Sequence, residues 1–251
     1  HPVKEVPKLF ANGKRLSGRD VEDLRNIEIE VGVLDSAQGS CKITWGRNMI
    51  IAAVRGPKEV FPKHLTNYNK AIVTCRYAMA PFSNQEEHSR AGPNRRAIEI
   101  SKVARHVFEN VILTEQFPKT QIEVHIEVLQ SDGGTRVAGI CAAALALVDA
   151  GIPVKDVIQG VSIGKIEGKL VVDLDKDEDN YGSGDVPIIV SLRTGEVLLF
   201  QLDGMFSLQE FEQILDYAFR GAAKVKEIQV KALLKKYEGM AASGNGGDSV
   251  N

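Results

Sequence analysis

The sequence predicts an α+β fold, and the order of its segments is the main reason. In each half of the chain, short segments with the alternation or the apolar composition of strands come first, and segments with helical periodicity follow them. Strands grouped before helices in this way are typical of α+β proteins. This order of segments recurs in the second half, which indicates a pseudo-repeat, although the residues of the two halves do not match. With 251 residues, the chain can bury a substantial core as one large domain or two closely packed halves.

The composition is that of an ordinary globular protein, with 43% hydrophobic and 25% charged residues. A net charge of −2 excludes a generally basic protein, so any RNA is expected to be held by local basic patches. No apolar run approaches the roughly 20 residues that span a bilayer, and no signal segment or membrane contact is expected. Cys41, Cys75 and Cys141 lack metal-site spacing and are expected to be free thiols of a cytoplasmic protein.

The first half begins with a polar segment, residues 1–20, that is predicted to be an extended arm. Alternating or apolar segments then predict strands, and the turn Gly46-Arg47-Asn48 is expected to join two of them as a hairpin. The predicted strands cover residues 27–31, 41–45, 49–54, 71–77 and 122–128.

Two helices are predicted in the same half. An apolar stripe at helical spacing runs from Ile100 to Val111, and Phe117-Pro118 is expected to end this helix. Residues 135–150 are rich in alanine and almost uncharged, so this second helix is expected to be buried on most of its surface. Gly151-Ile152-Pro153 is predicted to stop it.

The second half, from residue 151, repeats this order. A capping box, Ser207-Leu208-Gln209-Glu210, predicts the start of a helix that reaches about Tyr237. Residues 241–251 are small and polar and are expected to form a disordered tail. The strands that precede the helix are predicted at residues 157–166, 169–174, 187–192 and 197–202.

Three segments suggest binding or catalytic sites. The first is Gly92-Pro93-Asn94-Arg95-Arg96, which places two adjacent arginines at the start of the striped helix. Guanidinium groups beside free backbone N–H groups suit phosphate oxygens. A solvated basic turn that offsets nearby glutamates explains the same residues, and the motif alone favours that interpretation.

The second segment, Ser131–Arg136, joins a predicted strand to the buried helix. Gly133 and Gly134 let the backbone approach a ligand closely, while the helix start, Thr135 and Arg136 add hydrogen-bond donors. The segment predicts a pocket for one phosphate ion, and a tight turn capped by Thr135 is equally compatible. No GxxxxGK[ST] motif is present, so binding of a nucleoside triphosphate is not implied.

The third segment is the acidic stretch 173–185. Gly182 and Gly184 permit a sharp return of the chain, so Asp179 and Asp185 are expected to converge. Two such carboxylates can hold Mg²⁺, or one can act as a general acid whose pKa is raised by its neighbour. A solvated acidic loop is the ordinary alternative, and the spacing excludes an EF-hand.

A weaker candidate is the loop that contains Lys63, His64 and Tyr68. Its positive charge and aromatic ring suit single-stranded RNA, although an ordinary surface loop fits equally well.

In these segments the sequence resembles the RNase PH family, and most closely its catalytic members in the archaeal exosome. The resemblance covers about residues 15–235 in order. It is carried by RLSGR (15–19), EVGVL (30–34), MAPFS (79–83), GPNRRAIEIS (92–101), LQSDGGTRVAG (129–139), DAGIP (149–153), EDNYGSGDVP (178–187) and QLDG (201–204).

The resemblance implies the RNase PH fold, which is like domain 2 of ribosomal protein S5. A single domain, residues 21–240, would consist of two pseudo-symmetric βαβ-type halves, about 21–150 and 151–240. It also implies a hexameric ring built as a trimer of heterodimers with a paralogous, inactive RNase PH-type subunit. Cap subunits with S1, KH or zinc-ribbon modules would cover one face of that ring.

The same resemblance implies roles for the candidate residues. Gly134, Thr135 and Arg136 would bind inorganic phosphate, the co-substrate. Arg95 and Arg96 would clamp RNA phosphates near the 3′ end.

Of the two carboxylates, the resemblance makes Asp179 the general acid or key carboxylate. Asp185 would hold Mg²⁺ or Mn²⁺ beside it. Lys63, His64 and Tyr68 would face the narrow opening through which single-stranded RNA arrives.

The implied activity is that of a phosphorolytic 3′→5′ exoribonuclease, which releases nucleoside 5′-diphosphates and adds RNA tails in reverse. Three alternatives remain at this point: a free-standing RNase PH that trims tRNA 3′ ends, a non-catalytic RNA-binding ring subunit, and a metal-dependent hydrolase. The sequence departs from the family pattern at Asn94, where GPDRR reads GPNRR, and at Asn69-Lys70, where Asp-Arg is usual.

Overall fold

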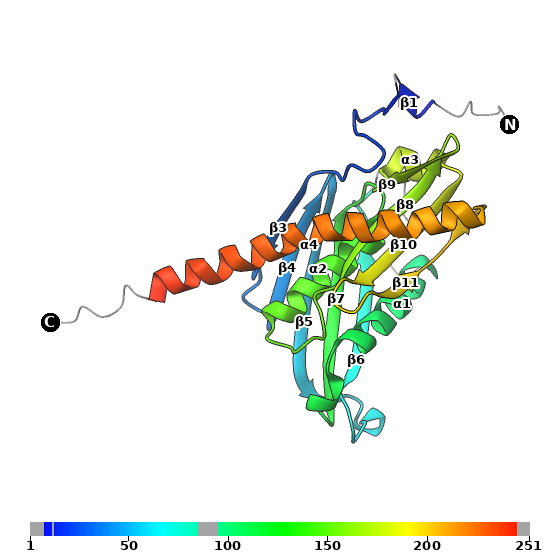
Figure 1. Cartoon of the computed structure of the whole chain (residues 1–251). Coiled ribbons are helices and arrows are strands. Elements are labelled where there is room, and N and C mark those ends of the chain that lie inside the picture. The colour runs from blue at the N-terminus through cyan, green and yellow to red at the C-terminus, as the bar shows by residue number, and fades with distance from the viewer. Residues whose placement is uncertain (1–7, 12, 85–94, 245–251) are drawn as a thin grey trace.

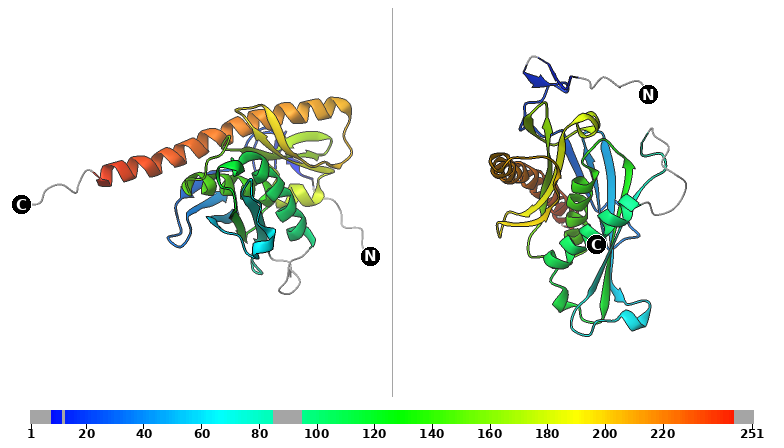
Figure 2. Two further views of the ribbon diagram at one scale, coloured as in Figure 1. Left: turned by 90° about the horizontal axis from the view of Figure 1, so that it is seen from below. Right: turned by 90° about the vertical axis from the view of Figure 1, so that its right-hand side faces the viewer.

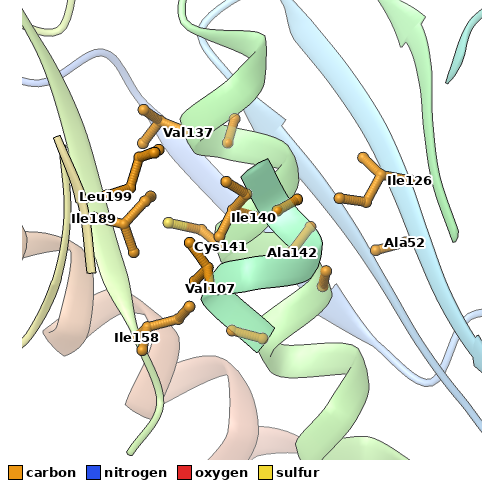
Figure 3. Packing of buried hydrophobic residues seen from close by; sticks show 14 of the residues in the cluster. Ala52, Val107, Ile126, Val137, Ile140, Cys141, Ala142, Ile158, Ile189 and Leu199 are labelled. Atoms are coloured by element: carbon orange, nitrogen blue, oxygen red, sulfur yellow. The ribbon is translucent and has the colours of Figure 1, made fainter. Parts of the chain in front are cut away.

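Two five-stranded β-sheets lie on either side of a buried helix, α2 (Thr135–Asp149), in this computed structural model (Figures 1 and 3). The structure describes residues 8–11, 13–84 and 95–244. Residues 1–7 of the predicted arm, Gly92–Asn94 of the arginine motif and residues 245–251 of the predicted tail lie outside the described residues.

The first sheet has the order β3-β4-β5-β7-β6. Among its described strands, β6 and β7 are parallel neighbours and the other neighbouring pairs are antiparallel. Helix α1 (Arg95–Val111) connects β6 and β7 as a βαβ unit. The predicted hairpin is confirmed, since Trp45 pairs with Asn48 across the turn. The strands are β3 (Ile27–Val31), β4 (Gly39–Trp45), β5 (Asn48–Glu59), β6 (Ile72–Met79) and β7 (Thr120–Gln130).

The second sheet has the order β11-β10-β8-β9, and a short strand, β12, also pairs with β10. All of its pairs are antiparallel. A short helix, α3 (Lys176–Tyr181), connects β9 to β10, which flank β8 on its two sides. The strands are β8 (Gln159–Ile166), β9 (Lys169–Val172), β10 (Gly184–Ser191), β11 (Glu196–Phe200) and β12 (Asp203–Gly204).

The core is continuous between the two sheets because α2 is apolar on nearly all of its surface. Figure 3 shows Ala52 and Ile126 of the first sheet on one side of this helix, and Ile189 and Leu199 of the second sheet on the other. The helix carries Gly139 where β7 approaches it, since a Cβ there would lie 2.7 Å from Cγ2 of Ile126. The prediction of a buried helix at residues 135–150 is confirmed.

Helix α4 (Leu208–Gly244) packs along the second sheet and β3, and its C-terminal part extends beyond the sheets (Figure 1). It begins with the predicted capping box, in which the N–H of Glu210 donates to Oγ of Ser207 at 3.2 Å. The helix passes its predicted end near Tyr237 and includes residues 241–244, which we expected in the tail. Alanines at 241 and 242 favour helix, which explains the difference. Among the described residues, no helix is both long and apolar enough to cross a membrane.

Two further segments differ from the predictions. Helix α1 ends at Val111 rather than at Phe117-Pro118, because a separate 3₁₀ turn, η2 (Thr114–Gln116), follows it. The arm contains a small hairpin, β1 (Phe10–Ala11) and β2 (Lys14–Arg15). Leu9 of this arm packs in a second, smaller apolar cluster with Ile166, Val171 and Leu174.

Candidate functional site

A polar pocket of about 430 Å³ opens between the starts of α1 and α2, the end of α3 and the paired strands β10 and β12. Both halves of the chain contribute residues to it. Its walls contain two arginines and three aspartates among small residues: Arg96, Arg136, Asp179, Asn180, Gly182, Ser183, Gly184, Asp185, Asp203 and Gly204.

Asp185 lies near the start of β10, where it pairs with Gly164 of β8 on one side and with Asp203 of β12 on the other. Its Oδ1 atom is buried and has no hydrogen-bond partner among the described residues. Burial and the neighbouring charge of Asp179 raise the pKa of Asp185 to about 7. The side chain is therefore suited to gaining and losing a proton near neutral pH.

Asp179 lies on α3, which begins with a capping box. The carboxylate of Asp175 accepts hydrogen bonds from the N–H groups of Asp177 and Glu178, and that of Glu178 accepts one from the N–H of Asp175 at 3.0 Å. Burial raises the pKa of Asp179, although Arg96 and Arg136 act in the opposite direction. We predicted no helix in this segment, although the sequence contains the Asp175-x-x-Glu178 signature of a capping box.

The structure thus brings Asp179 and Asp185 to the walls of one pocket. Asp203 is a third carboxylate there, and its charge contributes to raising the pKa of both. Within the described parts of the chain, no group of three or more acidic, His or Cys side chains is arranged to hold a metal ion. The unpaired Oδ1 of Asp185 nevertheless fits Mg²⁺, which usually takes one or two carboxylates and completes its coordination with water and substrate phosphate.

The predicted phosphate turn lies at the start of α2. Gly133 and Gly134 have φ values of 76° and 69°, a conformation that glycine adopts without strain. Gly134 is the N-cap residue, and no side chain among the described residues caps the helix there. The first N–H groups of a helix have no intrahelical partners, so this start can receive an anion. Thr135 lies inside the helix rather than at its cap, and its buried hydroxyl accepts a hydrogen bond of 2.9 Å from Tyr77.

Arg136 reaches the pocket from the first turn of α2. Its guanidinium group donates to Oε1 of Gln201 and lies 3.9 Å from Glu99, and Gln201 in turn donates to Glu99 at 2.9 Å. We assigned no role to Gln201 or Glu99 from the sequence, although both belong to motifs that carry the resemblance. Both arginines of the GPNRR motif are exposed. Arg96 lines the pocket, whereas Arg95 does not.

Lys63, His64 and Tyr68 do not contribute to this pocket. Lys63 and His64 form the exposed 3₁₀ turn η1 (Lys63–Leu65). It lies at the end of the first sheet opposite to α3, as Figures 1 and 2 show. Tyr68 is 72% exposed, and Nζ of Lys119 lies 5.3 Å from its ring centroid.

The chain is similar in sequence to known proteins of one family. Residues 23–153 match domain 1 of the 3′ exoribonuclease (RNase PH) family, and residues 156–221 match domain 2. The chain is 52% identical over 226 residues to the exosome complex component Rrp41 of Pyrococcus furiosus, which is 90% of each chain. It is 48% identical over 236 residues to that of Thermoplasma acidophilum, which is 94% of this chain and 95% of the relative.

Two solved structures have the same fold. Rice Rrp46 has a TM-score of 0.78 and 22% identity, over 88% of this chain and 100% of its own. A chain from the Archaeoglobus fulgidus exosome with RNA bound to the active site has a TM-score of 0.74 and 22% identity, over 85% of this chain and 92% of its own. The protein has the RNase PH fold and belongs to the 3′ exoribonuclease family.

Proposed function

We propose that this chain is the catalytic subunit of an archaeal exosome and degrades single-stranded RNA from the 3′ end by phosphorolysis. One observation carries the proposal: two carboxylates with raised pKa values and two arginines share a pocket beside an uncapped helix start. This set of groups can hold two anions, accept or release a proton, and offset negative charge. The identity to relatives named exosome component Rrp41 supports the assignment.

In the proposed reaction, inorganic phosphate binds to the N–H groups that begin α2 and to Arg136. One of its oxygens attacks the last phosphodiester of the RNA in line with the departing 3′ oxygen. Arg96 and Arg136 offset the negative charge that grows on the reacting phosphorus. The products are a nucleoside 5′-diphosphate and an RNA shortened by one residue, and the reverse reaction adds residues to a 3′ end.

The departing 3′ oxygen needs a proton, and we assign it to the pair of Asp179 and Asp185. The resemblance implied Asp179 as the acid, whereas the pKa of about 7 favours Asp185 as the carboxyl group that retains a proton at neutral pH. Because the two carboxylates are coupled, the proton belongs to the pair rather than to one residue. Mg²⁺ or Mn²⁺ held by these carboxylates would supply additional positive charge at the reacting phosphate.

RNA contacts in this proposal are independent of sequence. Arg95 and Arg96 bind backbone phosphates near the 3′ end. Lys63, His64 and the exposed ring of Tyr68 hold the strand farther away by charge and stacking. In the cytoplasm, three copies of the chain would alternate with a paralogous, inactive RNase PH-type subunit in a hexameric ring, with S1, KH or zinc-ribbon cap subunits on one face.

The experiment that tests this function uses the chain assembled with its paralogous partner, oligo(A) RNA and Mg²⁺. Reactions with and without inorganic phosphate are compared, and the released nucleotides are separated by chromatography. We expect adenosine diphosphate only when phosphate is present. Release of adenosine monophosphate without phosphate would show hydrolysis and contradict the proposal.

A further inference from the structure

The side chain of Arg25 connects the phosphate turn to the segment that leads into α3. Its Nη1 atom donates to the carbonyl oxygen of Asp132, and its Nη2 atom donates to that of Gly133 at 3.2 Å. On the other side, Nη2 donates to Oδ1 of Asp173 at 2.7 Å and Nε lies 3.1 Å from both carboxylate oxygens. Only 8% of the Arg25 side chain is exposed, so it has no direct access to RNA.

Asp173 is a fixed anchor for this arginine. Its side chain is 2% exposed and also accepts hydrogen bonds from the backbone N–H of Arg25 at 2.6 Å and from Nε1 of Trp45 at 3.0 Å. Its carbonyl oxygen accepts from Arg15 at 2.7 Å and from Arg19 at 2.8 Å. Burial alone would raise the pKa of Asp173, but Arg25 and Trp45 outweigh it and hold the pKa below its ordinary value. The carboxylate is therefore ionised and paired.

The carbonyl oxygens that Arg25 holds belong to the turn that begins α2. The C=O of Gly133 is part of the same peptide group as the N–H of Gly134. It accepts from Arg25 and also from Nδ2 of Asn48 at 2.7 Å. Donation to a carbonyl polarises its peptide group and strengthens the N–H as a donor. These bonds also fix the plane of the peptide and so the direction in which that N–H points.

The turn and the start of α3 are in close contact. A Cβ at Gly133 would lie 2.7 Å from the carbonyl carbon and 2.8 Å from the carbonyl oxygen of Asp175, the N-cap of α3. Because the contact is this close, a small shift of the turn would change its position relative to α3, the helix that carries Asp179. Arg25 holds the two segments in register because it binds both.

We propose that Arg25 is a positioning residue for inorganic phosphate. It sets the affinity of the turn for phosphate without contacting the ion. The inference rests on the proposed function, since phosphate is taken as the co-substrate at the start of α2. An arginine is needed because its planar fork of five donors reaches two carbonyls and a carboxylate together, whereas a lysine is a single point charge.

Arg19 provides a matched control. Its guanidinium group is 12% exposed and contacts the same anchor, with a bond of 2.8 Å to the Asp173 carbonyl and ion pairs to Asp175 and Glu178. None of the bonds made by Arg19 among the described residues reaches the Asp132 or Gly133 carbonyl. Loss of Arg19 therefore removes comparable buried charge contacts and leaves the turn held.

The test compares Arg25→Lys, Arg25→Gln and Arg19→Gln in the full chain assembled with its paralogous partner. The KM for inorganic phosphate, the KM for oligo(A), kcat at saturating phosphate and the thermal unfolding temperature are measured for each. Both Arg25 variants should raise the phosphate KM about tenfold, the size typical of losing a residue that supports a ligand-binding group, with the oligo(A) KM unchanged. Arg19→Gln should lower the unfolding temperature and keep the phosphate KM of the wild type.

Two results would overturn the inference: folded Arg25 variants with the wild-type phosphate KM, or an equal rise of the phosphate KM in Arg19→Gln, which would indicate a general loss of stability. If Arg25→Gln unfolds below the assay temperature, the phosphate KM of Arg25→Lys decides whether the inference holds.

The phosphate dependence of the wild-type enzyme distinguishes a failure of this inference from a failure of the proposed function. A wild-type enzyme that needs no phosphate contradicts the function itself, whereas a phosphate-dependent wild type with unchanged Arg25 variants contradicts only the positioning role.

Discussion

Arg15 and Glu178 form a buried ion pair that joins the N-terminal segment to the helix that carries Asp179. Nε of Arg15 donates to Oε1 of Glu178 at 2.7 Å, and the two side chains are 0% and 4% exposed. Arg15 also donates to the carbonyl oxygens of Val172 and Asp173. Glu178 closes the capping box of α3, so this pair holds the helix in place from outside the pocket.

Replacement of Arg15 by Met should destabilise the fold strongly, because it leaves the buried carboxylate of Glu178 with the more distant Arg19 as its cationic partner among the described residues. We expect a loss of roughly 3–5 kcal/mol in the free energy of unfolding, measured with denaturant. Lys14→Gln is the control, since Lys14 and its partner Asp20 are 59% and 65% exposed and their ion pair contributes little. Equal effects of the two substitutions would refute the structural role of the pair.

The contribution of Asp185 to the stability of the metal-free chain should fall as pH rises between about 4 and 7, because the folded state holds the proton of Asp185 more tightly than the unfolded chain. The folded pKa is raised, so the unfolded chain releases this proton first and gains stability relative to the folded state over that window. Asp185→Asn removes this titration. The difference in unfolding free energy between Asp185→Asn and wild type should therefore grow up to pH 7 and then level off. A difference that does not change with pH would contradict a raised pKa.

Loss of either carboxylate should stop turnover and spare RNA binding. Asp179→Ala and Asp185→Ala are expected to lower kcat by at least about a hundredfold, the contribution of a positioned acid. Fluorescence anisotropy with labelled oligo(A) should give nearly unchanged affinity, since the arginines remain. Asp203→Asn is the comparison for a carboxylate of the same pocket. An intact rate in Asp179→Ala or Asp185→Ala would show that the residue is not part of the proton-transferring pair.

Tyr68→Ala should weaken the binding of long RNA only. Stacking of a base on an aromatic ring contributes about 1–3 kcal/mol, and Tyr68 is not among the residues that line the pocket. The dissociation constant should rise for long oligo(A) and stay constant for a short oligonucleotide that fills the pocket alone. Tyr68→Phe keeps the ring and should bind like the wild type. A loss that is equal for both lengths would place Tyr68 in another role.

Which features of the fold and the site can be predicted from the sequence depends on how far apart in the chain the interacting residues lie. Helix α2 was predictable because residues 135–150 are apolar almost throughout, a local signal. The helix α3 was not predicted, since it is short and acidic, although its capping box is also local. Arg25 could not be found in this way, because its partners Asp132 and Asp173 are 107 and 148 residues away in the chain.

The same limit applies within the pocket. Arg95 and Arg96 look equivalent in the sequence, but neighbouring positions of a helix point about 100° apart, and only Arg96 lines the pocket. Asp179 and Asp185 were found because two glycines between them indicate a chain reversal. Asp203 was not, because the QLDG motif that contains it indicates no chemistry by itself, and only its strand pairing with Asp185 brings it to the pocket.

The most direct test of the central claim follows the phosphorus atom of inorganic phosphate. The assembled enzyme is supplied with unlabelled oligo(A), Mg²⁺ and ³²P-labelled inorganic phosphate, and the released nucleotides are separated. If phosphate held at the start of α2 is the attacking group, the label should appear in the β-phosphate of adenosine diphosphate, in proportion to the RNA shortened. Shortening of the RNA with release of unlabelled adenosine monophosphate would contradict it.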